Sequence, residues 1–299
     1  MFDKLIERLK NESIPYKENI RLRDYTTFQI GGNCPLAVSP ETAVHMQTVT
    51  TWLLENDCPY FVLGKGSNIL ASDNGYHGVL LLTQSLRTIE KNENTVRCGA
   101  GVSLSKLCAF AASHALSGLE FAWGIPGSVG GAVYMNAGAY GGEIVDVIKS
   151  ATFLEEDGTI RTLPAEELDL TYRHSCFTGT KRIILEAEFS LHPDEKEAIS
   201  ARMDDYIGRR TSKQPLDKPS AGSTFKRPKG GYASALIEQC GLKGFTIGGA
   251  QVSKKHSGFL INCGDATAAD MEALIHHVQR VVKEQTGFSL ECEVIHLGF

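Results

Sequence analysis

The stretch WGIPGSVGGAVYMNAGAYGGE, residues 123–143, holds seven glycines in 21 residues, whereas the whole chain of 299 residues has 30. Glycine tolerates positive φ and lets another backbone or a ligand come close. The polar side chains here are Ser128, Asn136 and Tyr140, and exposed amides can form an anion-binding concavity. This pattern favours a phosphate-bearing ligand over a metal ion. Tight turns between short strands would give the same composition.

A second glycine loop, GKGSN at residues 64–68, follows a predicted strand at residues 60–63. It is not a dinucleotide-binding fingerprint, because Ile69 stands where the third glycine would be, and it lacks the spacing of a Walker loop. Its backbone amides and short polar side chains still suit a diphosphate. A plain turn is the alternative.

Length and composition predict a globular protein of two domains, or of one domain with subdomains, since 299 residues exceed a typical domain. Hydrophobic residues make up 42% and charged residues 22%, which excludes disorder as the main feature. The net charge is −5 without a basic block, so we expect a small-molecule ligand rather than nucleic acid or a membrane. The amino terminus lacks a secretory signal, and no apolar run reaches a membrane-spanning length, which predicts a cytoplasmic protein.

The eight cysteines are expected to be reduced and mostly buried, because no two are closer than ten residues and no zinc knuckle or CxxC pair occurs. His276 and His277 are adjacent on a predicted helix and face different ways, so they cannot share a metal ion. We therefore expect no metal site.

Helical and strand patterns are mixed without strict alternation, which favours an α+β fold over a doubly wound sheet. The first part of the chain predicts an amino-terminal helix, a β-prone run at residues 24–32, a helix opened by Ser39, Pro40 and Glu41, and strands at residues 60–63 and 79–83 in a βαβ-like order. Further predicted elements are a strand at residues 95–98, a helix capped by Ser103, a hairpin of residues 150–154 and 159–163, and a strand at residues 183–190.

A domain boundary is expected after residue 195, where a charged helix at residues 194–210 leads into a Pro-rich stretch at residues 214–219. The chain then divides into residues 1–195, with subdomains of roughly 1–82 and 83–195, and residues 196–299. The second region predicts a short helix at residues 235–239, strand-like segments at residues 245–252 and 259–262, a helix at residues 267–285 capped by Thr267 and stopped by Gly287, and a strand at residues 289–297.

Three polar residues lack an obvious structural role: Arg173 in TYRHS, Ser223 in SAGSTFKRP and Glu293 in LECEVIHLG. From the residues alone, a surface ion pair, a turn serine and the exposed face of a strand explain them equally well. The GxSxG pattern of a nucleophile elbow does not occur in the sequence, which disfavours hydrolase chemistry.

Taken together, eight ordered motifs resemble the UDP-N-acetylenolpyruvoylglucosamine reductase (MurB) family, in its shorter type II subtype, over nearly the whole chain. They are TTFQIGG (26–32), LGKGSNIL (63–70), GIPGSVGGAVYMNAGAYGGE (124–143), TYRHS (171–175), SAGSTFKRP (220–228), LIEQCGLKG (236–244), AQVSKKHSGFLIN (250–262) and LECEVIHLG (290–298). One departure is GGYASALIE (230–238), where relatives often carry GYFAGKLIE, and no site role is assigned there.

The resemblance implies a vanillyl-alcohol-oxidase/PCMH-type FAD-binding fold in two subdomains, followed by a carboxy-terminal α+β substrate-binding domain. It also implies the reaction. NADPH reduces non-covalently bound FAD and leaves, and the enolpyruvyl ether of UDP-N-acetylglucosamine then receives hydride at its terminal methylene carbon. The product is UDP-N-acetylmuramate, a peptidoglycan precursor, which links the enzyme to cell shape and division. The flavin carries this redox chemistry. The oligomeric state stays open, and a monomer is compatible with the sequence.

The resemblance also implies residue roles. Arg173 stabilises the enolate, Ser223 donates the proton, and Glu293, protonated in part of the cycle, polarises the substrate carboxylate. The implied FAD contacts are Gly64, Lys65, Gly66, Ser67, Asn68, Gly127, Ser128, Gly130, Gly131, Asn136, Gly138, Ala139 and Tyr140. The implied substrate contacts are Lys213, Lys226, Arg227 and His256, although solvation beside two lysines also explains His256.

Two alternatives stay open. The first is another flavoprotein oxidoreductase of the same fold, which the motifs after Ser220 disfavour because a generic oxidase does not need them. The second is a nucleotide-sugar binding protein without catalysis, which the presence of Arg173, Ser223 and Glu293 disfavours.

Overall fold

The computed structural model describes residues 2–299, which form two compact units. Unit 1 comprises residues 2–17, Leu36–Lys65 and Gly78–Arg209. Unit 2 comprises Glu18–Pro35, Gly66–His77 and Arg210–Phe299. Each unit has its own cluster of buried apolar side chains, so unit 2 builds its core partly from segments near the amino terminus.

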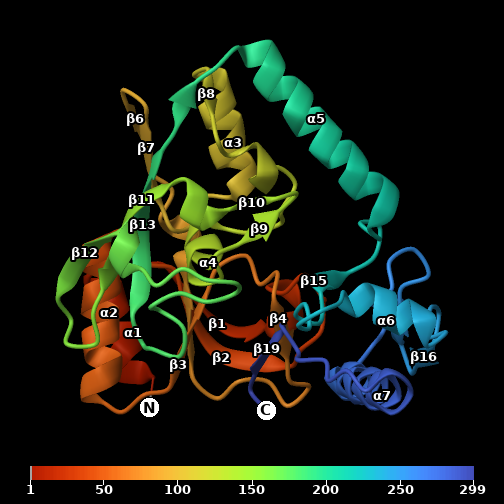
Figure 1. Ribbon diagram of the computed structural model, residues 1–299. Helices are drawn as coiled ribbons and strands as arrows, with labels where there is room; N and C mark the ends of the chain where they lie inside the picture. The colour runs from red at the N-terminus through yellow and green to blue at the C-terminus, as the bar shows by residue number, and fades with distance from the viewer. Residues whose placement is uncertain (1) are drawn as a thin grey trace. The chain divides into compact units, whose positions relative to one another are not determined.

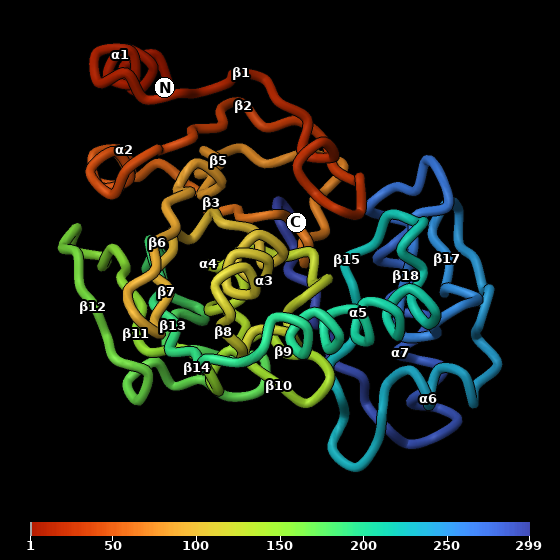
Figure 2. The backbone as a smooth tube through the Cα atoms, turned by 90° about the horizontal axis from the view of Figure 1, so that it is seen from above, coloured from red at the N-terminus to blue at the C-terminus, as the bar shows by residue number. Residues whose placement is uncertain are grey.

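The first sheet confirms the predicted βαβ-like order. Strands β2 (Asn33–Val38), β5 (Val79–Leu82) and β3 (Tyr60–Leu63) run parallel (Figure 1). The order in the sheet is β1-β2-β5-β3, with β1 (Tyr16–Arg21) at one edge (Figure 2). Strand β5 is buried along its whole length, as expected for an interior parallel strand. Helices α1 (Asp3–Asn11) and α2 (Ala43–Glu55) are neighbours and share the cluster of unit 1 (Figure 2).

Helix α2 begins later than predicted. Its cap is Thr42, whose Oγ1 accepts a hydrogen bond from the backbone N–H of His45 at 3.0 Å. The backbone N–H of Ser39 instead donates to the carbonyl oxygen of Pro15 at 2.8 Å. The prediction of Ser39 as the cap was therefore wrong, because a long-range backbone contact holds that residue outside the helix.

The β-prone run at residues 24–32 is not a strand, and that prediction was also wrong. It begins at the end of a 3-10 turn, η1 (Leu22–Asp24), and continues as irregular backbone with φ of 56° at Gln29 and 131° at Gly31. The hydroxyl of Thr26 donates to the carbonyl oxygen of Ile30 at 3.2 Å, a local bond that competes with a strand ladder.

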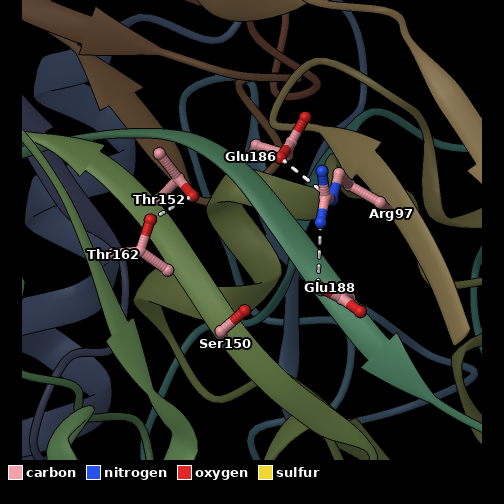
Figure 3. Close-up of a pocket in the computed structure, with 6 residues that line it drawn as sticks. All are labelled: Arg97, Ser150, Thr152, Thr162, Glu186 and Glu188. Carbon is pink, nitrogen blue, oxygen red and sulfur yellow. Dashed lines mark hydrogen bonds and ion pairs between the residues drawn. The ribbon is translucent and has the colours of Figure 1, made fainter.

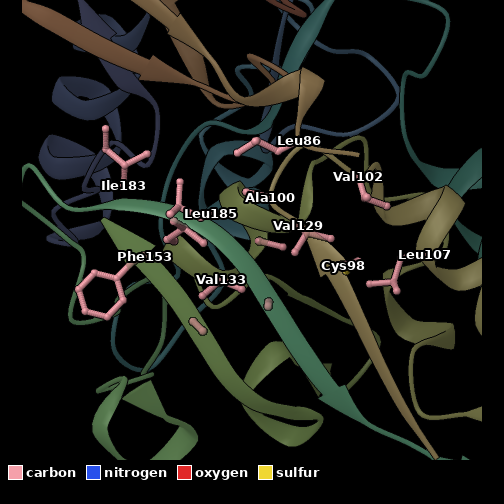
Figure 4. Packing of buried hydrophobic residues seen from close by; sticks show 14 of the residues in the cluster. Leu86, Cys98, Ala100, Val102, Leu107, Val129, Val133, Phe153, Ile183 and Leu185 are labelled. Carbon is pink, nitrogen blue, oxygen red and sulfur yellow. The ribbon is translucent and has the colours of Figure 1, made fainter. Parts of the chain in front are cut away.

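The second sheet of unit 1 is antiparallel, in the order β12-β11-β13-β7-β6, and includes the predicted hairpin. Its strands are β6 (Ile89–Asn92), β7 (Thr95–Gly99), β11 (Ile148–Leu154), β12 (Ile160–Pro164) and β13 (Ile183–Ser190). Apolar side chains of β7, β11 and β13 pack with those of α3 (Leu104–Ser113) and α4 (Val129–Tyr134) (Figure 4). Ser103 caps α3 as predicted, since its Oγ accepts from the N–H of Lys106 at 3.2 Å.

Helix α5 (Lys196–Lys213) is the predicted charged helix, and its residues from Arg210 onward belong to unit 2. In unit 1, Arg202 Nη2 lies 2.8 Å from Glu120 Oε1 and 2.5 Å from Asp194 Oδ2. Burial alone would raise the pKa of the Glu120 carboxyl, but hydrogen bonds from Gly118, Ser117 and Arg202 lower that pKa overall. This ion-pair network fixes the first half of α5.

Unit 2 contains an antiparallel sheet in the order β15-β18-β17-β16 and two helices. These elements are β15 (Ser220–Ser223), β16 (Thr246–Ile247), β17 (Ala250–Val252), β18 (Phe259–Asn262), α6 (Ala233–Gln239) and α7 (Ala268–Thr286). The predicted ends of α7 are confirmed: Thr267 and Asp270 form a capping box, and Gly287 takes the left-handed conformation at the carboxyl end.

The predicted final strand is shorter than expected. Only β19 (Ile295–Leu297) is a strand, and it pairs in parallel with β4 (Ile69–Ala71). The remaining short elements are β8 (Leu116–Ser117), β9 (Gly138–Ala139), β10 (Gly142–Glu143), β14 (His192–Pro193), η2 (Thr83–Ser85), η3 (Glu120–Ala122), η4 (Ile144–Asp146) and η5 (Ala165–Glu167).

All eight cysteines are free thiols. Cys34, Cys58, Cys98 and Cys108 are buried, whereas Cys263 is exposed, so the prediction of mostly buried cysteines holds for half of them. Burial raises the pKa of the Cys108 thiol to about 12. Across residues 2–299, no helix is long and apolar enough to cross a bilayer. In the same residues, no cluster of three or more His, Cys, Asp or Glu side chains is arranged to hold a metal ion.

Candidate active site

The start of the GKGSN loop meets the glycine-rich segment within unit 1. A Cβ atom at Gly64 would lie only 2.4 Å from the Oγ of Ser128, so a side chain there would push the loops apart. Gln84 Nε2 donates to the carbonyl oxygen of Gly64 at 3.0 Å and fixes the start of the first loop. Ser128 is buried, and its Oγ accepts from the N–H of Gly131 at 3.5 Å, which caps α4. The structure thus brings together two of the sequence-predicted cofactor segments.

The loop GKGSN offers its own backbone donors. None of the hydrogen bonds formed among residues 2–299 uses the backbone N–H of Lys65, Gly66, Ser67 or Asn68. Gly66 has φ of 64°, and a Cβ atom there would lie 2.0 Å from the carbonyl oxygen of Tyr25, so this turn requires glycine. Consecutive unused amides beside an exposed lysine fit a diphosphate.

Part of the glycine-rich segment is explained by packing within the protein. A Cβ atom would lie 2.9 Å from the Cβ of Ala100 at Gly130 and 2.7 Å from the ring of Phe121 at Gly142. At Gly127 it would lie 3.3 Å from Leu104 Cδ1. Close packing inside the protein, rather than a tight turn or a ligand, therefore explains these three glycines.

The end of the segment is a short hairpin that carries an aromatic side chain. Gly138 and Ala139 form β9, which pairs with β10, and Tyr140 and Gly141 make the turn with φ of 55° and 90°. The ring of Tyr140 stacks on that of Tyr206 in α5, with centroids 4.9 Å apart and planes at 3°. Tyr140 is 36% exposed, so its ring still presents a surface to a ligand.

Arg173 sits on a strained turn. Thr171 and His174 exchange backbone hydrogen bonds at 3.2 and 3.1 Å, which leaves Tyr172 and Arg173 as the two turn residues. Arg173 has φ of 56°, and its guanidinium carbon lies 5.0 Å from the centroid of the Tyr172 ring. A non-glycine residue with positive φ costs free energy and commonly marks a functional site.

Ser223 and Glu293 are neighbours in unit 2, although 70 positions separate them in the sequence (293 − 223). The backbone N–H of Glu293 donates to the carbonyl oxygen of Thr224 at 2.8 Å, beside an antiparallel bridge between Phe225 and Cys292. Gly222 has φ of 76° at a register shift between Ser220 and Ser223. Such bulges re-aim the next side chain, here that of Ser223.

His256 lies close to β15, the strand that carries Ser223. Its ring packs edge-on against Phe259, which pairs with Ser223 in the sheet. Burial lowers the pKa of His256, and the charges of Lys243 and Lys213 lower it further. Its Nδ1 accepts from the N–H of Gly258 at 3.2 Å. The neutral imidazole therefore keeps its proton on Nε2, where it is a donor.

The other predicted substrate cations lie in unit 2 as well. Lys213 is the exposed last residue of α5. Lys226 Nζ lies 2.5 Å from Glu291 Oε1, so binding a phosphate would exchange this ion pair for another. The Arg227 guanidinium carbon lies 4.9 Å from the ring centroid of Tyr232. Tyr232 is 62% exposed and belongs to GGYASALIE, the segment whose sequence differs from the family pattern.

A shallow hollow on the antiparallel sheet of unit 1 contains none of the predicted site residues. Arg97 lies between Glu186 and Glu188, with ion pairs of 3.5 and 3.3 Å, and Thr152 bonds Thr162 at 2.9 Å (Figure 3). These side chains alternate along the strands with the buried apolar ones of the opposite face. The hollow is therefore the solvated face of the sheet.

Comparison with known proteins decides the family. The model of the UDP-N-acetylenolpyruvoylglucosamine reductase carboxy-terminal domain matches residues 214–297, and the model of an FAD binding domain matches residues 35–164. The UDP-N-acetylenolpyruvoylglucosamine reductase of Clostridium novyi is 48% identical, with 99% of this chain and 95% of that protein covered. The chain belongs to this reductase family.

Further relatives agree with this assignment. The reductase of Syntrophomonas wolfei is 46% identical over 100% of this chain and 99% of that protein. The crystal structure of the MurB reductase of Thermus caldophilus has a TM-score of 0.83 at 35% identity and covers 95% of this chain and 99% of that one. An alkyldihydroxyacetonephosphate synthase structure, 17% identical with a TM-score of 0.51, covers 64% of this chain and 41% of that one and shares the fold alone.

The family settles the fold and the reaction. The fold is the α+β, vanillyl-alcohol-oxidase/PCMH-type FAD-binding fold with a carboxy-terminal substrate domain, as the sequence predicts. The reductase uses FAD to convert the enolpyruvyl ether of UDP-N-acetylglucosamine to UDP-N-acetylmuramate for peptidoglycan synthesis. The resemblance stated from the motifs is confirmed.

Sequence reasoning missed two side-chain contacts of the site. Asn68, predicted as a cofactor contact, donates through Nδ2 to the carbonyl oxygen of Glu293 at 3.0 Å. Asn136, also predicted as a cofactor contact, donates to the carbonyl oxygen of Thr171 at 3.1 Å. The sequence does single out both asparagines, because they stand in glycine-containing loops. It does not show their partners, which are distant in the sequence.

Proposed function

We propose that Arg173, Ser223 and Glu293 carry out the reaction at the substrate and that NADPH is the hydride donor that reduces FAD. The observation that carries this proposal is the pairing in unit 2, where the N–H of Glu293 bonds the carbonyl oxygen of the residue after Ser223. A hydroxyl at the end of β15 and a carboxyl group on the neighbouring extended segment are thereby brought together. That pairing suits a proton donor working beside an acid.

When bound, FAD would supply the hydride that reduces the enolpyruvyl group at its terminal methylene carbon. Arg173 stabilises the negative charge that develops on the adjacent carbon and its carboxylate, more in the transition state than in the ground state. The Ser223 hydroxyl gives its proton to that carbon, because a carbanion-like centre is basic enough to accept it. Lys226 and Arg227 follow in the chain and stabilise the serine anion until it regains a proton.

Glu293 faces a substrate group that is itself a carboxylate. Two carboxylates in contact share a proton, so we propose that Glu293 is protonated in part of the cycle and donates a hydrogen bond to the substrate. Its main chain is fixed by the bonds to Thr224 and Asn68, and the side chain is half-buried.

For the cofactor, we propose that the loop of residues 64–68 holds the FAD diphosphate and that residues 127–140 line the flavin. The unused amides of the loop and the exposed ring of Tyr140 support this assignment. Residues 1–195 would then form the cofactor-binding region and residues 196–299 the substrate region.

For the substrate, we propose that Lys213, Lys226, Arg227 and His256 bind its polar groups, with the two lysines and Arg227 on phosphate. Their common place in unit 2 and the donor tautomer of His256 support this. A monomer in the cytoplasm completes the proposal.

The proposal is tested on the purified protein. We expect a yellow protein with a flavin absorbance spectrum and an NADPH oxidation that depends on UDP-N-acetylglucosamine enolpyruvate. A colourless protein, or NADPH oxidation indifferent to that substrate, would contradict it.

A further inference from the structure

Asn136 is a fully buried amide in the middle of the cofactor segment, with 0% exposure. Its Nδ2 donates to Glu143 Oε2 at 2.9 Å and to the carbonyl oxygen of Thr171 at 3.1 Å. Its Oδ1 accepts from the backbone N–H of Val145 at 2.9 Å. Both amide hydrogens are therefore used inside the protein.

This arrangement separates the Asn136 side chain from any ligand. A buried amide whose donors are both satisfied would lose protein hydrogen bonds before it could make one to a cofactor. The side chain therefore acts on protein groups, while its backbone belongs to the lining segment.

The group that Asn136 holds is the base of the Arg173 turn. The carbonyl oxygen of Thr171 is the acceptor, and Thr171 itself exchanges backbone bonds with His174 across the turn. The far side of the turn is tied as well, because the hydroxyl of Ser175 donates to the carbonyl oxygen of Tyr134 at 2.8 Å. Both sides of the turn are thus attached to the end of α4.

We propose that Asn136 is a positioning residue for Arg173: its amide fixes the turn of residues 171–174 to the cofactor segment and so fixes where the guanidinium is presented. The inference rests on the proposed role of Arg173. On this inference, the Asn136 side chain does not contact the cofactor but acts through Arg173.

Asparagine suits this position for two reasons. Its φ is 41°, in the left-handed region that asparagine tolerates better than most residues. An aspartate would lose both donors and would place a second carboxylate against Glu143, whereas a glycine would keep the backbone and delete only the amide. Asn136→Gly therefore removes the hydrogen bonds without adding backbone strain.

The test compares Asn136→Gly with the wild type as FAD-loaded enzymes in stopped-flow experiments. We expect FAD affinity and flavin reduction by NADPH to stay within about threefold, and flavin reoxidation by substrate to slow about 10- to 100-fold, as for a misplaced catalytic group. We also expect faster hydrogen–deuterium exchange at the amides of Thr171 and His174, a readout independent of activity.

A double-mutant cycle with Arg173→Ala decides whether the effect acts through Arg173. In the Arg173→Ala background, Asn136→Gly should change reoxidation by less than about twofold. Full multiplication of the two effects, or equal slowing of both half-reactions, would overturn the inference. An Arg173→Ala enzyme with unchanged reoxidation would instead overturn the proposed role of Arg173.

Asn262→Ala in unit 2 is the matched control. Asn262 is 4% exposed, and its amide bonds the carbonyl oxygen of Phe28 and the N–H groups of Gly264 and Ala266. Its loss should lower stability without separating the half-reactions. If Asn136→Gly does not fold, Asn136→Ala, which also deletes the amide without adding a charge, is judged by the same criteria, including the cycle with Arg173→Ala.

Discussion

The Arg173 turn in unit 1 and the Ser223–Glu293 pair in unit 2 are held in different ways. The turn has a φ of 56° at Arg173 and is attached to α4 by the side chains of Asn136 and Ser175. Ser223 and Glu293 are instead placed mainly by backbone hydrogen bonds between extended segments, with one side-chain bond from Asn68 to the carbonyl oxygen of Glu293. Deleting a side chain far from the chemistry should therefore disturb the turn more than the pair.

The cofactor loops take part in both arrangements. Asn136 of the glycine-rich segment holds the base of the Arg173 turn, and Asn68 of the GKGSN loop holds the carbonyl oxygen of Glu293. Asn68 is supported by main-chain pairing, because its own carbonyl oxygen accepts from the N–H of Ile295 at 2.9 Å next to the β4–β19 ladder. The asparagine of unit 1 thus acts together with a second side chain, Ser175, whereas that of unit 2 acts beside a backbone ladder.

Among the variants of unit 1, Arg173→Ala should have the largest effect on the rate of flavin reoxidation. Losing the guanidinium removes charge stabilisation in the transition state, so we expect flavin reoxidation by substrate to fall about 10²- to 10³-fold, with reduction by NADPH nearly unchanged. Stopped-flow absorbance measures both steps. His174→Ala, which removes a neighbouring side chain bonded to Asp169, is the control and should have little effect.

The variants Glu293→Ala and Glu293→Gln together test whether Glu293 acts as a hydrogen-bond donor. If Glu293 works as a protonated donor, glutamine keeps an N–H donor and should slow reoxidation about tenfold, whereas alanine should slow it about 10²-fold. Rapid-reaction kinetics with both variants gives the ratio. Equal losses for the two variants would rule out a role as a hydrogen-bond donor.

Gly64→Ala tests the contact between the two glycine loops. The new Cβ atom would lie 2.4 Å from Ser128 Oγ, and relieving such overpacking costs about 1–3 kcal/mol. We expect the FAD dissociation constant, measured by flavin fluorescence, to rise about tenfold. Gly208→Ala on α5 is the control, because its Cβ would meet no described atom within 4 Å apart from its chain neighbours and its own helix backbone, and the FAD affinity of this variant should not change.

The pH dependence of stability should differ between the two units. This difference is the smallest of the effects that we expect. The pKa of His256 in unit 2 is lowered from 6.5, chiefly by burial. As pH falls below 6.5, His256 is protonated more readily in the unfolded chain than in the folded protein. The free energy of unfolding is therefore higher above pH 6.5 and decreases below it. The pKa of Glu120 in unit 1 is lowered from 4.5, so its contribution is present above that pH and lost below it.

Denaturant unfolding of His256→Gln checks the unit 2 part. Between about pH 7.5 and about pH 5.5, the variant should lose less stability than the wild type does. His277→Gln is made in parallel, because burial also lowers the pKa of His277. An unchanged slope in His256→Gln would show that this histidine does not titrate differently on unfolding.

Local chemistry made much of the fold predictable. Ser103, Thr267 and Gly287 mark helix ends through bonds and a backbone conformation that involve only nearby residues, and the hairpin at residues 148–164 pairs adjacent segments. The errors at Ser39 and at residues 24–32 arise where distant contacts prevail. One such contact is the bond from the N–H of Ser39 to Pro15.

The site shows the same division. Arg173, Ser223 and Glu293 can be singled out as residues, and the family motifs assign them roles. The pairing of Glu293 with Thr224 and the tie from Asn136 to Thr171 depend on segments brought together by folding. The spacing of these residues in the sequence does not predict either contact.

The most direct test of the account is the half-reaction kinetics of Ser223→Ala, with Ser220→Ala on the same strand as control. Because the serine gives its proton only after substrate has bound, reduction by NADPH should stay near the wild-type rate while reoxidation by UDP-N-acetylglucosamine enolpyruvate slows by orders of magnitude, about 10²-fold or more. Ser220→Ala should leave both steps nearly unchanged. Equal slowing of both half-reactions in Ser223→Ala, or reoxidation at the wild-type rate, would contradict the assignment of Ser223 as the proton donor.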